Sequence, residues 1–200
     1  MISMRCALLL AMFATVCGCA SPPVPDVSYY RVASIDVGPK TADKHFAIPL
    51  VVDTLIADGV YNDQSILYVT SPEGSLKAYH YQLWDESPGQ MLQRRLIDTL
   101  RARNAARLVT DRLPTSIDSL RISGRIKRFE RVKDGDAWLA RVRMELRVER
   151  GTQQEPLLLS DYGADVPADS DSIQATVRAF AVAMDQSYAA FWAELQQVTH

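Results

Sequence analysis

Apolar residues recur every four positions between Leu92 and Leu100, a spacing typical of a helix with one buried side. The start of this helix is well marked. Ser87 suits the N-cap, Pro88 suits the first helical position, and Gln90 stands where a capping box needs it. We therefore predict that one side of the helix is buried and carries Leu92, Leu96, Ile97 and Leu100. The other side should face solvent and carries Gln93, Arg94, Arg95 and Asp98.

A second, longer apolar stripe runs to the C-terminus. Before it, Asp169, Ser170, Asp171 and Ser172 place hydrogen-bond acceptors and negative charge where a helix would begin. Packing against a core is the favoured interpretation of the stripe, and a coiled-coil or partner seam is the alternative. Its residues follow at steps of three or four: Ile173, Val177, Phe180, Met184, Tyr188, Phe191, Leu195 and Val198.

Two other stretches show the period of two that is typical of strands. In Ala137 to Glu149 the alternation is nearly complete, whereas in Ser119 to Glu130 it breaks before Phe129. The turn residues Asp134 and Gly135 between the stretches predict a hairpin. Phe129 can share the apolar face of this hairpin only if an extra residue is inserted before it.

We place this β-bulge at Lys127 and Arg128. In the register that we expect, apolar residues oppose each other as Ile126 and Val142, Ile122 and Leu146, and Leu120 and Val148. On the other face, like charges oppose each other as Arg125 and Arg143, and as Arg121 and Arg147. Because such pairs are unfavourable, negative charge should lie over them. Its source is either the diagonal neighbours Glu145 and Glu149, or an acidic partner surface or anionic lipid headgroups, which would make these arginines a docking face.

Shorter strands complete the predicted fold. We expect strands at Tyr29–Val37, Phe46–Ile56, Ser65–Thr70, Leu76–Tyr81, Arg107–Thr110 and Leu157–Tyr162, and a loop at Gly163–Ala168. Pro49 indicates that the strand Phe46–Ile56 lies at an edge of the sheet or contains a bulge. The predicted fold class is α/β (α+β), with a single mainly antiparallel or mixed sheet and two main helices packed on one face.

The N-terminus reads as a bacterial lipoprotein signal. Arg5 is followed by a short apolar core, and VCGC at positions 16–19 resembles a lipobox with Cys19 as the acylated residue. An ordinary signal peptide with an accidental cysteine is the alternative. We predict a signal peptide at 1–18, lipidated Cys19 with a Pro-rich tether over 19–27, and a domain over 28–200.

The cysteine positions agree with this interpretation. The three cysteines are Cys6, Cys17 and Cys19, so the processed chain would have no thiol beyond the acylated one and no disulfide. Ala20 differs from the aspartate that retains enteric lipoproteins at the inner membrane. By analogy, we expect a lipid-anchored protein, with palmitate-type acyl chains, on the periplasmic side of the outer membrane of a Gram-negative bacterium.

Composition and motifs exclude several functions. Arg5 is the single charged side chain of residues 1–18, so removal of these residues changes the formal charge from -2 to -3. This negative net charge argues against nucleic-acid binding. The histidines His45, His80 and His200 are not spaced as metal ligands. We find no catalytic or nucleotide-binding motif, so we expect no metal, no other cofactor and no enzymatic activity.

Two segments resemble a known family: GVYNDQSILYVT at Gly59 to Thr70, and the stretch from Trp84 to Leu96 with its run GQMLQRRL. They are similar to the ABC-type transport auxiliary lipoproteins, the family that includes paraquat-inducible protein C. In element order the resemblance covers Ser28 to Val198. It implies that the chain assists an ABC transporter with an MCE-domain subunit in moving lipids between membranes. The matching motif residues are Tyr79, Tyr81, Trp84, Pro88, Leu92 and Leu96.

Two other functions remain open at this point: a periplasmic lipid carrier with an apolar cavity, and an enzyme that modifies the cell envelope. Trp84 and the tyrosines Tyr79 and Tyr81 could stack on a ligand, although packing between elements is the favoured interpretation. The sequence also leaves the number of copies open, a homo-oligomer included.

Overall fold

The computed structural model describes residues 25–35, 44–71, 74–151 and 155–198. One mixed sheet and two long helices confirm the predicted fold class. The predicted signal peptide, Cys19 and the predicted tether up to Val24 lie outside the described residues. The elements are β1 (Ser28–Tyr30), β2 (Leu50–Val52), β3 (Ile56–Ala57), the 3-10 turn η2 (Gly59–Asn62), β4 (Ser65–Val69), β5 (Lys77–Trp84), α2 (Pro88–Ala102), β6 (Val109–Thr110), β7 (Leu120–Asp134), β8 (Ala137–Arg150), β9 (Leu158–Pro167) and α3 (Ile173–Leu195).

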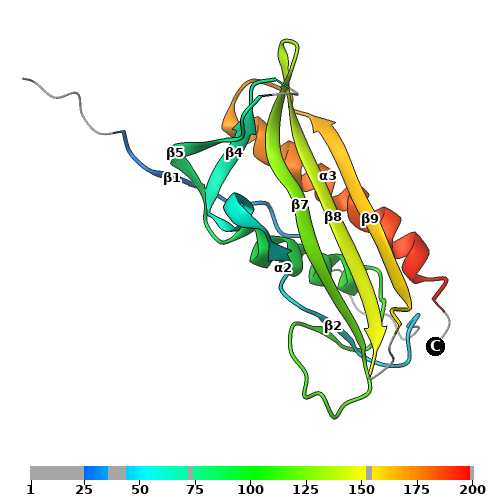
Figure 1. Cartoon of the computed structure of the whole chain (residues 1–200). Helices are drawn as coiled ribbons and strands as arrows, with labels where there is room; N and C mark the ends of the chain where they lie inside the picture. Colours follow the sequence, from blue (N-terminus) through cyan, green and yellow to red (C-terminus); the bar gives the residue numbers. More distant parts are fainter. Residues whose placement is uncertain (1–24, 36–43, 72–73, 152–154, 199–200) are drawn as a thin grey trace, which may run out of the picture.

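The sheet is built around β7, which is paired along both of its edges (Figure 1). One edge pairs antiparallel with β8, and β8 pairs antiparallel with β9. The other edge pairs in parallel with β2, β3 and β4, each along a different part of β7. From β4 the sheet continues through β5 to β1, and from β2 it continues to β6. A single long strand therefore joins all the others.

The predicted bulge is confirmed, but the predicted register is wrong. The register shifts between Ile126 and Arg128, which leaves Lys127 as the extra residue. Ile126 faces Met144 rather than Val142, a displacement of two residues along β8. The true register follows from the turn, because Asp134 pairs with Ala137 across only two loop residues, with Gly135 at φ 55°.

The observed strands differ from the prediction most clearly in three places. The segment predicted as one strand from Phe46 to Ile56 is divided into β2 and β3, with an isolated bridge at Phe46. Pro49 cannot donate a ladder hydrogen bond, but its carbonyl accepts one from Leu120 N at 3.0 Å. β1 ends at Tyr30, well before the predicted end at Val37, which is outside the described residues. β9 continues to Pro167, so the loop predicted at Gly163–Ala168 is mostly strand.

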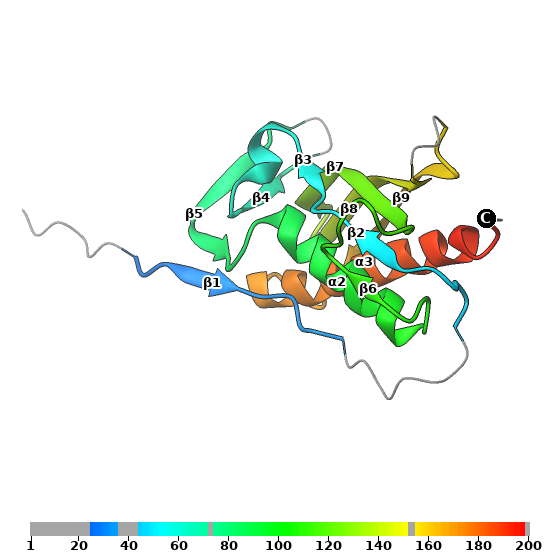
Figure 2. The same ribbon diagram turned by 90° about the horizontal axis from the view of Figure 1, so that it is seen from below.

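Both helices pack on the same face of the sheet (Figure 2). Ser87 caps α2, because its Oγ accepts from Gln90 N at 3.5 Å and donates to Gln90 Oε1 at 2.9 Å. Ser172 caps α3 in the same way by accepting from Ala175 N. No helix in the described part of the chain is long and apolar enough to cross a bilayer.

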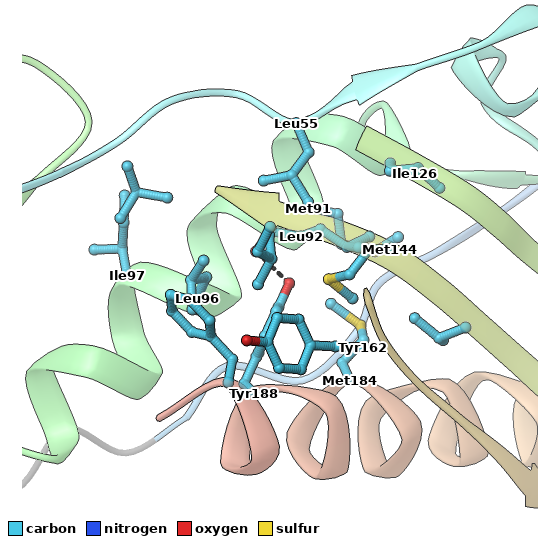
Figure 3. Close-up of a cluster of buried hydrophobic side chains, with 14 of the residues drawn as sticks. Leu55, Met91, Leu92, Leu96, Ile97, Ile126, Met144, Tyr162, Met184 and Tyr188 are labelled. Atoms are coloured by element: carbon cyan, nitrogen blue, oxygen red, sulfur yellow. Dashed lines mark hydrogen bonds between the residues drawn. The ribbon is translucent and has the colours of Figure 1, made fainter. Parts of the chain in front are cut away.

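The apolar stripes of the two helices meet in the core. Leu92, Leu96 and Leu100 are fully buried, and so is Tyr188 of α3. The hydroxyl of Tyr188 donates to the carbonyl oxygen of Leu92 at 2.8 Å, which joins α3 to α2 (Figure 3). The prediction that the α3 stripe packs against the core is therefore confirmed.

Arg95 is the exception on the predicted solvent side of α2. Its side chain is buried, and it donates to both carboxylate oxygens of Asp185 on α3 at 2.7 and 2.8 Å. It also donates to the carbonyl oxygen of Ala33. Because α3 and the segment after β1 both cover this side of α2, a residue that looks exposed on the isolated helix becomes buried. The ion pair fixes the position of α3 on α2.

We predict that Leu96→Ala lowers the free energy of unfolding by about 2–5 kcal/mol, because it removes a fully buried side chain and leaves a cavity. Leu108→Ala is the matched control, since Leu108 is 43% exposed; it should change stability by less than about 1 kcal/mol. Denaturant midpoints measure both. Equal midpoints for the two variants would contradict the buried position of the α2 stripe.

Candidate functional site

The face of β7, β8 and β9 opposite the helices carries the four arginines predicted as a docking face. Each of them has a carboxylate partner. Arg121 pairs with Asp53, Arg125 with Asp58, and Arg143 with Asp165 at 2.9 Å, and Arg147 pairs with Glu149 at 2.5 Å. We call this surface the helix-free face.

The observed register differs from the arginine pairing that we predicted across β7 and β8. Arg125 lies opposite Glu145, and Arg121 lies opposite Glu149, so neither meets another arginine across the strands. Opposite charges at these positions stabilise the hairpin. Between β7 and β8, the like-charge pair that does occur is Arg128 with Arg143. Whether the four arginines dock a partner is untested by the fold and stays a prediction.

The bulge opens a hollow of about 730 Å³ in the helix-free face. Gly163 of β9 contributes to it, because a Cβ there would meet the carbonyl oxygen of Val142 and lie 2.5 Å from Cδ of Arg143. The side chain of Arg143 therefore needs a glycine opposite it. Other residues around the hollow come from η2 and its N-cap and from the strands: Asp58, Tyr61, Lys127, Arg128 and Asp161.

A buried acid lies beside this hollow. Glu130 is 5% exposed, and its Oε2 accepts a hydrogen bond from the hydroxyl of Tyr61. Arg128 donates to the same hydroxyl at 3.4 Å, and its Nε is 4.0 Å from Glu130 Oε1. Burial, together with the hydrogen bond to Glu130, raises the pKa of Tyr61 to about 12. The hydroxyl therefore stays protonated and acts as a donor at neutral pH.

Asp165 holds two arginines on the neighbouring strand. Burial by itself raises the pKa of its carboxyl, but the hydrogen bonds and charges of Arg141 and Arg143 outweigh it and lower the pKa. Arg141 Nη2 and Arg143 Nη1 each lie 2.9 Å from an Asp165 oxygen. Lys127 similarly bridges Glu145 and Asp161 at 3.1 and 2.6 Å. These cations are thus held in place by carboxylates from β8 and β9.

The charged groups of the helix-free face are arranged in pairs. Among the residues that the structure describes, no three His, Cys, Asp or Glu side chains are grouped so that they could hold a metal ion. The polar groups of the face are paired with one another, so they present alternating charge and hydrogen-bonding capacity to a partner.

The family-motif residues lie along β5 and α2, and none of them is among the residues around the hollow. Trp84 is 1% exposed, with its ring centroid 5.5 Å from that of Phe129 and 5.4 Å from that of Phe180. Pro88 begins α2, and Leu92 and Leu96 are in its buried stripe. Tyr79 packs on Tyr68, and Tyr81 is half-buried. The interpretation of Trp84 as a packing residue is confirmed, because it lies in the core.

The structure adds Arg131, which the sequence analysis did not single out. Its side chain is buried near the β7–β8 turn, with the guanidinium 3.7 Å from the centre of the Trp138 ring. It donates to the hydroxyl of Tyr79 at 2.8 Å and to the carbonyl oxygen of Asp171. The sequence could have indicated the burial of Arg131. The predicted bulge turns Phe129 toward the helices, and Arg131, two residues later, then lies on the same side.

Comparison with known proteins identifies similar chains. A family model described as "ABC-type transport auxiliary lipoprotein component" matches residues 34–190. Protein XCC0632 from Xanthomonas campestris has a similar solved structure, with a TM-score of 0.71, 18% identity, and coverage of 85% of this chain and 96% of that one. A second solved structure, of an uncharacterized protein, has a TM-score of 0.63, 16% identity, and coverage of 86% and 99%. No curated protein sequence matches the chain. The two structures support the fold.

We predict that Tyr61→Phe lowers the free energy of unfolding by about 1–3 kcal/mol at neutral pH, because Glu130 loses a donor while it stays buried. The cost should depend on pH in a defined way. The pKa of Tyr61 is about 12 in the folded state and near 10 when unfolded, so this stabilisation is complete below pH 10 and is lost as the pH rises through 12.

Urea unfolding of both proteins between pH 7 and 12 measures this difference, which should shrink above pH 10. Tyr29→Phe is the control for general tyrosine ionisation, because Tyr29 is 64% exposed. A difference between wild type and Tyr61→Phe that stays constant across this range would contradict the hydrogen bond to Glu130.

Proposed function

Because the chain belongs to the ABC-type transport auxiliary lipoprotein family, we propose that it is a non-catalytic docking component of an ABC transporter. The family match over residues 34–190 is the observation that carries this proposal, since it includes β2 to β9 and most of α3. The partner that we propose is a periplasmic subunit with an MCE domain. The cargo would be lipid moving between the inner and outer membranes, which supports envelope integrity.

The N-terminal sequence supports a lipid anchor. Cys19 follows Val16, Cys17 and Gly18 at the end of a short apolar segment, which resembles a lipoprotein processing site. Acyl chains contribute roughly 0.8 kcal/mol for each buried methylene, so several chains would hold the protein at the membrane permanently. With Ala20 after the cysteine, we place the anchor in the periplasmic leaflet of the outer membrane.

The helix-free face is the surface that we propose for the transport partner. It lies on three long paired strands, so its side chains are held in a fixed arrangement. Its exposed charges come in both signs, which suits a polar interface of defined register. The hollow beside Tyr61 and Arg128 provides a concave point on an otherwise broad surface.

The two alternative functions have weaker support. A lipid carrier needs an apolar cavity, but the hollow in the helix-free face is rimmed by charged side chains such as Arg128 and Asp161. Ile126, Met144 and Tyr162 lie beneath it and are at most 4% exposed, so their apolar side chains belong to the core. An envelope-modifying enzyme is disfavoured by the family's description as a transport component.

We predict that Cys19→Ser abolishes fatty-acid labelling of the protein and leaves it either unprocessed or soluble in the periplasm, because the acylated sulfur is lost. Metabolic labelling with a clickable fatty acid, followed by fractionation, measures both. Cys17→Ser is the matched control, because this thiol is two residues away and should not be acylated. Label that persists in Cys19→Ser would overturn the anchor.

We predict that the wild-type protein, solubilised in mild detergent, captures an MCE-domain protein. Replacing Arg121, Arg125, Arg143 and Arg147 by glutamine should reduce this capture at least about tenfold, because a docking face depends on complementary charge. Each lost ion pair should lower stability by no more than about 1 kcal/mol, since the pairs are partly exposed.

The charge-matched control replaces Arg103, Arg107, Arg112 and Arg178, which are exposed and lie away from the helix-free face. Capture that survives the first set of changes would leave the helix-free arginines as ordinary surface. If the wild-type protein captures no MCE-domain protein at all, the proposed partnership is wrong.

A further inference from the structure

The first described residues of the chain present two large hydrophobic side chains to solvent. Val27 is 48% exposed and Tyr29 is 64% exposed. Within the described part, Tyr29 is the most exposed of the large hydrophobic residues and the one aromatic residue among those classed as exposed. Single exposed apolar residues are common on protein surfaces, so their neighbours decide whether they form a patch.

The neighbouring strand β5 extends this surface. Tyr29 is in register with Leu83, so the two side chains point to the same side of the sheet. Trp84 points to the opposite side, into the core. Leu83 is half-buried. We call Val27, Tyr29 and Leu83 the tether-side patch.

The patch is a fixed part of the folded domain. β1 pairs in parallel with β5, and Asp85 N donates to the carbonyl oxygen of Tyr30 at 3.0 Å. Arg31 adds an ion pair with the side chain of Asp85. On the other side of the strand, Val32 is buried and Tyr30 packs against the core. The outward direction of Tyr29 is therefore set by the fold and not by the tether before it.

The patch lies where the chain leaves the domain toward its anchor. Figures 1 and 2 show β1 along one edge of the molecule, and β9 on the far side of β7 and β8. Cys19 precedes Val27 by eight residues, which can span at most about 29 Å even when fully extended. Once Cys19 is acylated, Val27 cannot be farther than this from the lipid surface.

We propose that the tether-side patch rests in the headgroup region of the bilayer that holds acylated Cys19. This inference rests on the lipid anchor of the proposed function. The chemistry of the patch fits, because a tyrosine places an apolar ring against the acyl boundary while its hydroxyl stays among polar headgroups. The contact gives the domain one orientation on the membrane.

Single-cysteine labelling of the acylated full-length protein tests this orientation. After processing, the sulfur of Cys19 is acylated, so an introduced cysteine is the one free thiol. Val27→Cys and Tyr29→Cys are the test positions. Leu159→Cys on β9 and Val182→Cys on α3 are matched controls, because their native side chains are 50% and 44% exposed. Each variant is labelled with nitrobenzoxadiazole and reconstituted into vesicles of phosphatidylethanolamine and phosphatidylglycerol that contain a nitroxide-labelled lipid.

We expect quenching by the nitroxide to be at least about twofold stronger at positions 27 and 29 than at the controls, because interfacial residues lie within reach of the acyl boundary. Equal quenching at all four positions, or stronger quenching at a control, overturns the orientation while the anchor stands. Flotation of the vesicles separates the two failures: protein that does not float with the lipid has no anchor, and that result overturns both. A thermal melt of each variant verifies that the labelled domain is folded.

Discussion

The fold depends on one extra residue in β7. Lys127 interrupts the alternation of this strand, and as a result Phe129 faces the helices, where its ring centroid is 4.5 Å from that of Phe180. Without the bulge, the same period would turn Phe129 toward solvent and Glu130 toward the core. The bulge therefore reconciles two segments of β7 that must both contribute to one core. On the opposite face it produces the hollow next to Arg128, so core packing and surface shape have the same origin.

Local sequence patterns predicted the features that are set by local physics. The cap at Ser87 and the bulge at Lys127 could be identified because each depends on residues that are close in the sequence. The predicted register of β8 against β7 was wrong by two residues. The apolar pattern alone did not fix the number of loop residues in the turn at Gly135. Any even displacement keeps the apolar side inward, so the pattern cannot distinguish such registers.

Contacts between distant segments could not be read from the sequence. Arg95 is polar and lies on the side of α2 that looks solvated, and only the position of α3 shows that Asp185 covers it. Likewise, nothing near Tyr61 indicates that its hydroxyl meets Glu130, because these residues are 69 positions apart in the chain. Such pairs make the burial of a charge tolerable, since each buried polar group needs a partner in a medium of low polarity.

The family-motif residues of β5 and α2 lie where the N-terminal strand is joined to the core. β1 is hydrogen-bonded to β5, whose last residue, Trp84, is enclosed by Phe129 and Phe180. Three residues beyond Trp84, Ser87 starts α2 and so joins the same strand to the Leu92 stripe. A force on the N-terminal segment would pass through backbone pairing into β5 and then into the densest part of the core. Trp84, Leu92 and Leu96 are therefore packing residues, whereas the other matching segment, Gly59–Thr70, contributes Tyr61 to the hollow.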